Sequence, residues 1–317
     1  MIRLFAENRA LTVFLLPIFA VGYVLLNTFF PYYELSNDID FGLFGTYTVS
    51  NPLVKQIGGG AIVFLNAVAI NLVFNNQNFH EKTIYLPAFI YIVWMSFFEE
   101  MYNPGGFLLA HTFYILILSQ LFRLNQNEDG KKLVFNAAFF AGVATCLHPT
   151  MVILLPFLFI MVWILRPFVF RESLLLITGF ITPILYAGVL MLYQHESFQW
   201  NWNLNLISIE NQPFNLFVMA SLILLFIIFS AFGIRVKLQK SSIRLRKLTR
   251  ILWVLLFLAG CIGVADFLLA QQEESFSLLF VILPFFSVFS FVKKPLSVLA
   301  NGLFIIIIIC SLLKFFL

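Results

Sequence analysis

Apolar stretches of about 15 to 22 residues recur along the whole chain, and short polar connectors separate them. Runs of this length suit helices that cross a bilayer, and they are too uniformly apolar for the alternating strands of a membrane barrel. The pattern predicts an all-α polytopic transmembrane bundle of about eleven spans. The expected spans are 10–31, 57–74, 83–98, 106–122, 133–147, 151–165, 173–192, 214–234, 251–270, 276–292 and 295–316.

The composition supports a membrane protein and excludes several kinds of soluble enzyme. Apolar residues make up 61% of the chain and charged residues only 11%, whereas soluble domains have about half and about a quarter. No phosphate-binding loop, dinucleotide-binding glycine motif or nucleophile elbow occurs in the sequence. The first apolar run has no signal-peptide cleavage site after it, so we expect it to be retained as a span.

The basic residues predict the topology. With the N-terminus in the cytoplasm, all of the 19 lysines and arginines except Lys55 and Lys314 fall on inner connectors, as the positive-inside rule requires. His148 and Pro149 interrupt the stretch 133–165, and we interpret this stretch as two short spans or a re-entrant pair. A single span there would turn the basic segment 235–250 outward, which the rule disfavours. The sequence thus predicts a multi-pass membrane protein with its N-terminus in the cytoplasm.

The expected outer face is acidic, and two clusters of carboxylates lie beside predicted helix ends. The first outer loop carries Asp38 and Asp40, and the second begins with the adjacent pair Glu99 and Glu100. A carboxylate at such a boundary can act as a general base or bind a divalent metal ion. The alternative is that these are ordinary solvated loop residues. The sequence does not show whether a metal is present.

Several other polar residues are candidates for substrate contact on the same face. His111 and His148 fall near outer helix ends, and Trp200 and Trp202 alternate with asparagines in a later outer loop. The histidines can line an outer cavity or simply form hydrogen bonds between helices. The tryptophans can stack on a sugar ring or anchor the interface.

The basic segment 235–250 mixes cations with apolar residues. We expect it to lie on anionic membrane lipids, without any role for nucleic acid.

From residue 10 to residue 213, the order of elements resembles the GT-C superfamily of polyprenyl-phosphate-sugar glycosyltransferases. The similarity lies in the acidic first and second outer loops and in the run from Ala137 to Thr150 that leads into Leu154-Leu155-Pro156. The resemblance implies Asp38 or Asp40 as the catalytic carboxylate, Glu99 or Glu100 as the second acidic position, and a polyprenyl phosphate carrier as donor. Lys55 is the one outer-loop cation for the lipid phosphate. The large outer C-terminal domain of many members is missing.

These features divide the chain into two parts and leave three functions open. Residues 1–213 form the expected GT-C-like core, and 214–317 form further spans with the basic loop 235–250. The first hypothesis is a glycosyltransferase acting on the periplasmic side. The second is a non-catalytic subunit that binds other inner-membrane proteins, because the 41 phenylalanines and the small size also resemble uncharacterised membrane families of Gram-negative bacteria. The third is a transporter of small molecules or lipids, although Asp266 is nearly alone as an intramembrane charge. We expect Asp266 to be buried against other helices or an aqueous cleft, and not to face lipid.

The topology is testable with reporter fusions. Fusions placed after Lys132, Arg171 and Arg246 should all report a cytoplasmic location, because each follows an inner basic connector. An outward signal after Arg246, from a fusion protein of normal abundance, would show that 133–165 crosses the membrane once.

Overall fold

The computed structural model describes residues 5, 10–33, 38–80, 82–125, 130–193, 213–239, 241–270, 274–292 and 296–316. Within these ranges the α-helices are α2 (Ala10–Phe29), α3 (Pro52–Asn76), α4 (Leu86–Met95), α5 (Gly106–Leu124), α6 (Lys131–Leu147), α7 (Leu154–Leu165), α8 (Phe170–Tyr193), α9 (Pro213–Leu238), α10 (Ile243–Ala270), α11 (Leu279–Val292) and α12 (Leu296–Leu313). The 3-10 helices are η1 (Gly42–Phe44), η2 (Glu99–Met101), η3 (Pro149–Ile153) and η4 (Glu274–Leu278). The strands are β1 (Asp38–Asp40) and β2 (Thr46–Thr48).

The helices confirm the all-α expectation, since the described residues contain eleven α-helices and each coincides with one predicted span. Six of them, α2, α3, α5, α8, α9 and α10, are long and apolar enough to cross a membrane. The chain is therefore a helical membrane protein. Helix α4 has 10 residues and reaches only about 15 Å, half the thickness of a hydrocarbon core. The sequence did not predict the short antiparallel hairpin of β1 and β2.

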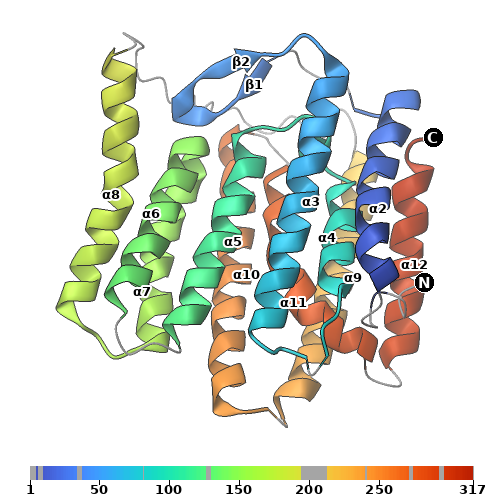
Figure 1. Cartoon of the computed structure of the whole chain (residues 1–317). Helices are drawn as coiled ribbons and strands as arrows, with labels where there is room; N and C mark the ends of the chain where they lie inside the picture. The colour runs from blue at the N-terminus through green and yellow to red at the C-terminus, as the bar shows by residue number, and fades with distance from the viewer. Residues whose placement is uncertain are drawn as a thin grey trace.

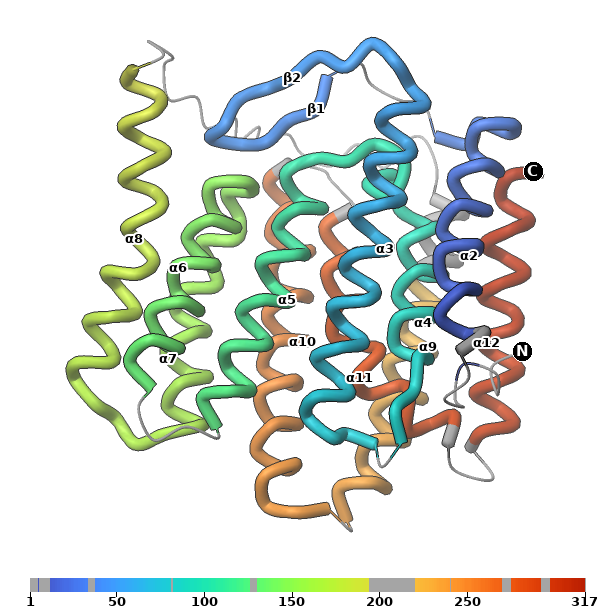
Figure 2. The backbone as a smooth tube through the Cα atoms, viewed as in Figure 1, coloured from blue at the N-terminus to red at the C-terminus, as the bar shows by residue number. Residues whose placement is uncertain are grey.

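The bundle has two opposite ends (Figure 1). The acidic end carries the β1–β2 hairpin, η2, η4 and the link between α6 and η3, and we name it after the carboxylates of these elements. The basic end is the opposite end, where α3, α5, α7 and α9 finish, and Arg123, Arg166 and Arg235 lie in or beside the last turns of α5, α7 and α9. Helices α2 and α12 lie side by side (Figure 2) and finish together at the acidic end, where the ring centroids of Phe30 and Phe316 are 5.0 Å apart. They therefore run in the same direction, as an odd number of predicted crossings requires.

The break within 133–165 is confirmed and has a local cause. Helix α6 ends at Leu147, and His148 adopts an extended conformation (φ −147°, ψ 114°) before Pro149 starts η3. The proline ring disfavours helical backbone at the residue before it. The chain reverses here, so that α6 and α7 are antiparallel neighbours at the acidic end (Figure 1).

The hairpin rests directly on the ends of α5 and α6. Gly42 has a positive φ of 64°, and a Cβ there would lie 2.5 Å from the carbonyl oxygens of Cys146 and Leu147. A Cβ at Gly106, the first residue of α5, would lie 2.4 Å from the Leu147 oxygen. Only glycine permits both the backbone conformation and the close approach. The hairpin is thus held against the acidic end by backbone packing.

An aromatic cage fixes the end of α12 to the acidic end. The Lys314 ammonium lies 4.7 to 5.6 Å from the centroids of five rings, those of Tyr32, Tyr33, Phe97, Tyr102 and Phe315. The rings attract the cation, and the Lys314 ammonium also donates to the backbone carbonyl oxygen of Ser96, which follows α4. Burial raises the pKa of the Tyr102 phenol, which stays neutral and donates to the same Ser96 oxygen at 3.0 Å. Lys314 therefore lies at the same end of the bundle as the predicted outer loops and is surrounded by aromatic rings.

Helices α6 and α8 approach closely through glycines, and this contact can be tested. A Cβ on Gly142 of α6 would lie 2.3 Å from the Phe180 carbonyl oxygen and 2.5 Å from Pro183, whereas Gly188 of α8 has nothing within 4 Å. We expect Gly142→Ala to lower the free energy of unfolding by about 1 to 3 kcal/mol, because the helices must separate. Gly188→Ala should be neutral or stabilise by up to about 1 kcal/mol. Thermal unfolding of both variants in the same detergent measures the difference, and equal melting temperatures would contradict it.

Candidate functional site

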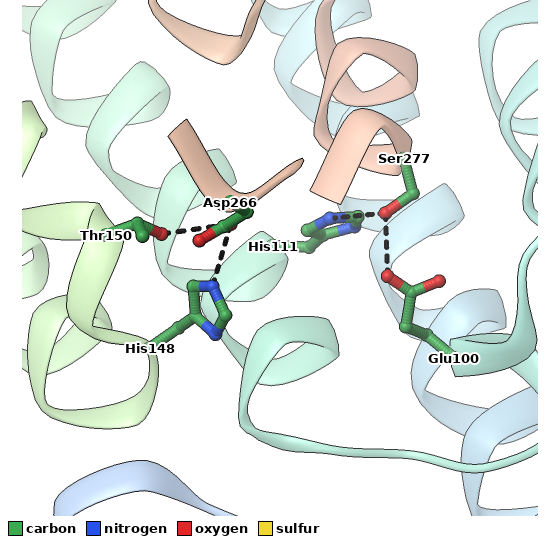
Figure 3. Close-up of polar contacts among 6 residues, drawn as sticks. All are labelled: Glu100, His111, His148, Thr150, Asp266 and Ser277. Carbon is green, nitrogen blue, oxygen red and sulfur yellow. Dashed lines mark hydrogen bonds and ion pairs between the residues drawn. The ribbon is translucent and has the colours of Figure 1, made fainter. Parts of the chain in front are cut away.

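The acidic end holds a layer of buried polar side chains between the hairpin and the apolar core. Figure 3 shows six of these residues in two groups. One group is Asp266, His148 and Thr150, and the other is Glu100, Ser277 and His111. We call these six residues the polar layer. They come from α10, the α6–η3 link, η3, η2, η4 and α5, so the layer brings together distant parts of the sequence.

Asp266 is the centre of the first group. It lies near the end of α10 and is 1% exposed, which confirms its predicted burial. Its Oδ2 atom is 2.9 Å from Nε2 of His148 and accepts a hydrogen bond of 3.0 Å from the Thr150 hydroxyl. A carboxylate oxygen can only accept here, so Nε2 of His148 carries the hydrogen and Nδ1 is the basic nitrogen of the neutral ring.

His148 is more exposed to solvent than Asp266. The His148 side chain is 16% exposed, compared with 2% for the side chain of Asp266. In Figure 3 the second ring nitrogen of His148 lies on the side away from Asp266. The imidazole is thus held by a buried carboxylate through one nitrogen while the other faces away from it. This is the arrangement of a histidine general base and its orienting acid.

The second group is a chain of hydrogen bonds centred on His111. The Ser277 hydroxyl donates to Oε1 of Glu100 at 3.1 Å and lies 3.3 Å from Nε2 of His111. The Tyr91 hydroxyl lies 3.1 Å from Nδ1 of the same ring. Because Ser277 donates its proton to Glu100, Nε2 of His111 donates to the serine oxygen and Nδ1 accepts from Tyr91. All four residues are buried, so the chain is shielded from water.

Phe107 lies between the two groups. Its ring centroid is 4.7 Å from that of His148 and 5.1 Å from that of His111, edge to face in both cases. Helix α3 supports the layer from another side, because a Cβ on Gly59 would lie 2.3 Å from the Met101 carbonyl oxygen in the turn beside Glu100. The two groups therefore form one packed layer divided by an aromatic ring.

The hairpin carboxylates lie outside this layer. Asp38 and Asp40 are exposed, and both form hydrogen bonds within the hairpin. Oδ1 of Asp38 accepts from the Thr48 hydroxyl at 2.8 Å, and Oδ1 of Asp40 accepts from the Gly42 amide at 2.8 Å. The Asp40 backbone nevertheless passes close to the start of α5, since its carbonyl oxygen would be 3.5 Å from a Cβ on Gly105. The predicted catalytic role of Asp38 and Asp40 therefore falls on exposed side chains outside the polar layer.

Of the other predicted site residues, some lie in the polar layer and some lie outside it. Glu99 is half-buried and accepts from the Asn103 side chain at 3.1 Å, while its neighbour Glu100 enters the layer. Lys55 was expected in a loop, but it lies in the first turn of α3 and is 2% exposed, because Asn51 caps that helix earlier than predicted. Trp200 and Trp202 lie outside the described residues.

The described residues contain no group of three or more histidines, cysteines and carboxylates that could hold a metal ion. Sequence reasoning identified both histidines, Glu100 and Asp266 singly but missed Ser277, Thr150 and Tyr91. Serine, threonine and tyrosine are common in membrane helices, so no local signal distinguishes these three.

The chain belongs to a protein family of unknown function, DUF6427, whose family model matches residues 39–317. No curated protein and no solved structure matches the chain. The matched region includes the whole polar layer and all of the hairpin except Asp38.

The adjacent residues Glu99 and Glu100 provide a matched test of the layer. We expect Glu100→Ala to lower the free energy of unfolding by about 1 to 3 kcal/mol, because Ser277 loses its acceptor in a buried site. Glu99→Ala removes the same charge from a half-exposed position and should cost less than about 1 kcal/mol. Thermal unfolding in detergent measures both variants. A larger effect of Glu99→Ala would show that the layer does not stabilise the acidic end.

Proposed function

We propose that this member of a family of unknown function is a membrane transferase that works at the acidic end of its bundle, with His148 as general base. The observation that carries the proposal is the pair of Asp266 and His148, in which a buried carboxylate 2.9 Å away holds a partly exposed imidazole. Such a pair performs proton abstraction in many unrelated enzymes.

The reaction class follows from the GT-C resemblance and from the chemistry of the pair. An acceptor hydroxyl gives its proton to Nδ1 of His148, and its oxygen forms a bond to the anomeric carbon of a sugar. The bond between that carbon and the polyprenyl phosphate oxygen breaks, and the phosphate leaves with the electron pair. Asp266 stabilises the imidazolium that forms. The proton later returns to solvent.

His148 suits this role better than the hairpin carboxylates. Asp38 and Asp40 are exposed and hold the turn, whereas His148 is oriented by a group with almost no access to water. A base is most effective when its direction is fixed before substrate arrives. The hairpin then covers the site, and Glu100, Ser277 and His111 form its buried wall.

The proposed location also follows from charge. The connectors at the basic end would face the cytoplasm by the positive-inside rule, which places the acidic end at the periplasmic side of a bacterial inner membrane. A polyprenyl phosphate carrier and a hydroxyl acceptor would both reach the acidic end there.

A second candidate is a non-catalytic subunit of a membrane complex. It is favoured by one observation: five carboxylates of the acidic end accept hydrogen bonds from neighbouring protein groups, which is also how a purely structural layer is built. These are Asp38, Asp40, Glu99, Glu100 and Asp266. In that case the layer stabilises a surface that binds other membrane proteins.

Complementation of a deletion strain separates these alternatives. We expect His148→Gln to reduce function by about 10² to 10⁴, because glutamine keeps polarity but cannot accept the proton as a base. The double variant Asp38→Asn with Asp40→Asn should retain function. Membrane abundance is measured for every variant, so that folding defects are recognised.

The outcomes are distinct. Loss of function only in the double aspartate variant would assign the base to the hairpin and leave the transferase proposal intact. Full restoration of every phenotype by both sets of variants, at normal abundance, would exclude the transferase and favour the subunit.

A further inference from the structure

The basic end contains a pocket of about 380 Å³ that the function proposed above does not use. It lies between the connector after α3 and the turn that joins α9 to α10. A pocket of this size falls within the range of small-molecule sites. Its lining residues are Asn78, Phe79, His80, Lys237, Ser241, Ser242 and Leu245.

Three lining side chains can donate hydrogen bonds to an anion. The Lys237 ammonium is a donor, and its Nζ atom lies over the ring of Phe289, 5.9 Å from the centroid. The Ser242 oxygen accepts from the Leu245 amide at 3.3 Å, which leaves its hydroxyl hydrogen available. Lysine and serine are common ligands of phosphate groups.

His80 is a third donor when its ring is protonated. Its Nδ1 atom lies 3.1 Å from the backbone nitrogen of Lys82 and 3.2 Å from the Lys82 carbonyl oxygen, so Nδ1 accepts from the amide or donates to the carbonyl according to the tautomer. The protonated ring carries a hydrogen on both nitrogens, and its Nε2 then donates as well.

The charge of the surroundings favours an anion. None of the lining residues is acidic, and residues 235–250 contain seven cations and no carboxylate. Glu81, next to His80, lies outside the described residues. Arg244 donates to the Gln77 side chain at 2.9 Å and so joins the start of α10 to the C-cap of α3, two segments whose neighbouring residues line the pocket.

We infer that this pocket binds a phosphate-bearing anion, through Lys237, His80 and Ser242. The phosphate can belong to the headgroup of an anionic lipid or to a free phosphate in solution. The basic end is where lipid headgroups of the facing leaflet lie, and the seven cations raise the local concentration of either anion. The pocket adds to this general attraction a defined position lined by Lys237, His80 and Ser242.

Thermal unfolding of the full chain in a neutral detergent tests the inference. The melting temperature is measured against increasing phosphatidylglycerol and, separately, inorganic phosphate, and the shift gives an apparent affinity. We expect Lys237→Gln to weaken binding about tenfold or more, and Lys237→Arg to retain it. The matched control is Lys247→Gln, which removes the same charge from a half-buried lysine of the same segment that does not line the pocket. Its effect should stay below about twofold.

Each outcome has one meaning. Stabilisation by phosphatidylglycerol alone identifies a lipid headgroup as the ligand, and stabilisation by both anions shows that free phosphate is sufficient. Equal weakening by Lys237→Gln and Lys247→Gln would overturn the inference, because it would show only diffuse attraction to an anionic surface. Absence of stabilisation by either anion would overturn it as well. The melting temperatures without ligand show whether each variant is folded.

Discussion

The acidic end depends on one constraint: a polar side chain enclosed by an apolar bundle must find its partner within the protein. The polar layer satisfies this constraint with side chains from six segments. Asp266 is bound by His148 and Thr150, and Glu100 is bound by Ser277, which also contacts His111. Each of these contacts links parts of the chain that the helices alone would not fix. The layer therefore helps to set how α5, α6 and α10 pack at this end, and the hairpin packs on the ends of α5 and α6.

The same contacts explain why the layer is a good place for chemistry. A histidine that is held by a buried carboxylate is both a structural cross-link and an oriented base, and nothing in the geometry separates the two roles. His148 combines them because it stands at the break before Pro149, where the extended backbone turns its ring toward α10. The Lys314 ammonium also has its partners within the protein, but these are aromatic rings instead of a carboxylate. The contacts of Lys314 hold the end of α12 against the acidic end.

The two ends of the bundle differ in how far their charged side chains are buried. At the acidic end the carboxylates of the polar layer are buried and paired, and Lys314 is enclosed. At the basic end many cations remain on the surface, and a pocket lined by Lys237, His80 and Ser242 opens between two connectors. Burial fixes the geometry of a charged group, whereas exposure leaves it available for lipid or solute. This asymmetry is consistent with a protein whose two faces meet different partners.

The sequence by itself determined the eleven helices, the break at His148-Pro149, the separation of acidic from basic ends and the burial of Asp266. These follow from local rules, because helix length, proline geometry and the cost of charge in lipid act on neighbouring residues. Only the tertiary structure decided that Asp266 pairs with His148, 118 positions away, and that Ser277 pairs with Glu100, 177 positions away. It also placed Asp38 and Asp40 on an exposed hairpin and buried Lys55 in α3. A sequence shows which side chains need partners, but the choice among them depends on how helices pack across the bundle, and that packing is set by contacts between residues far apart in the chain.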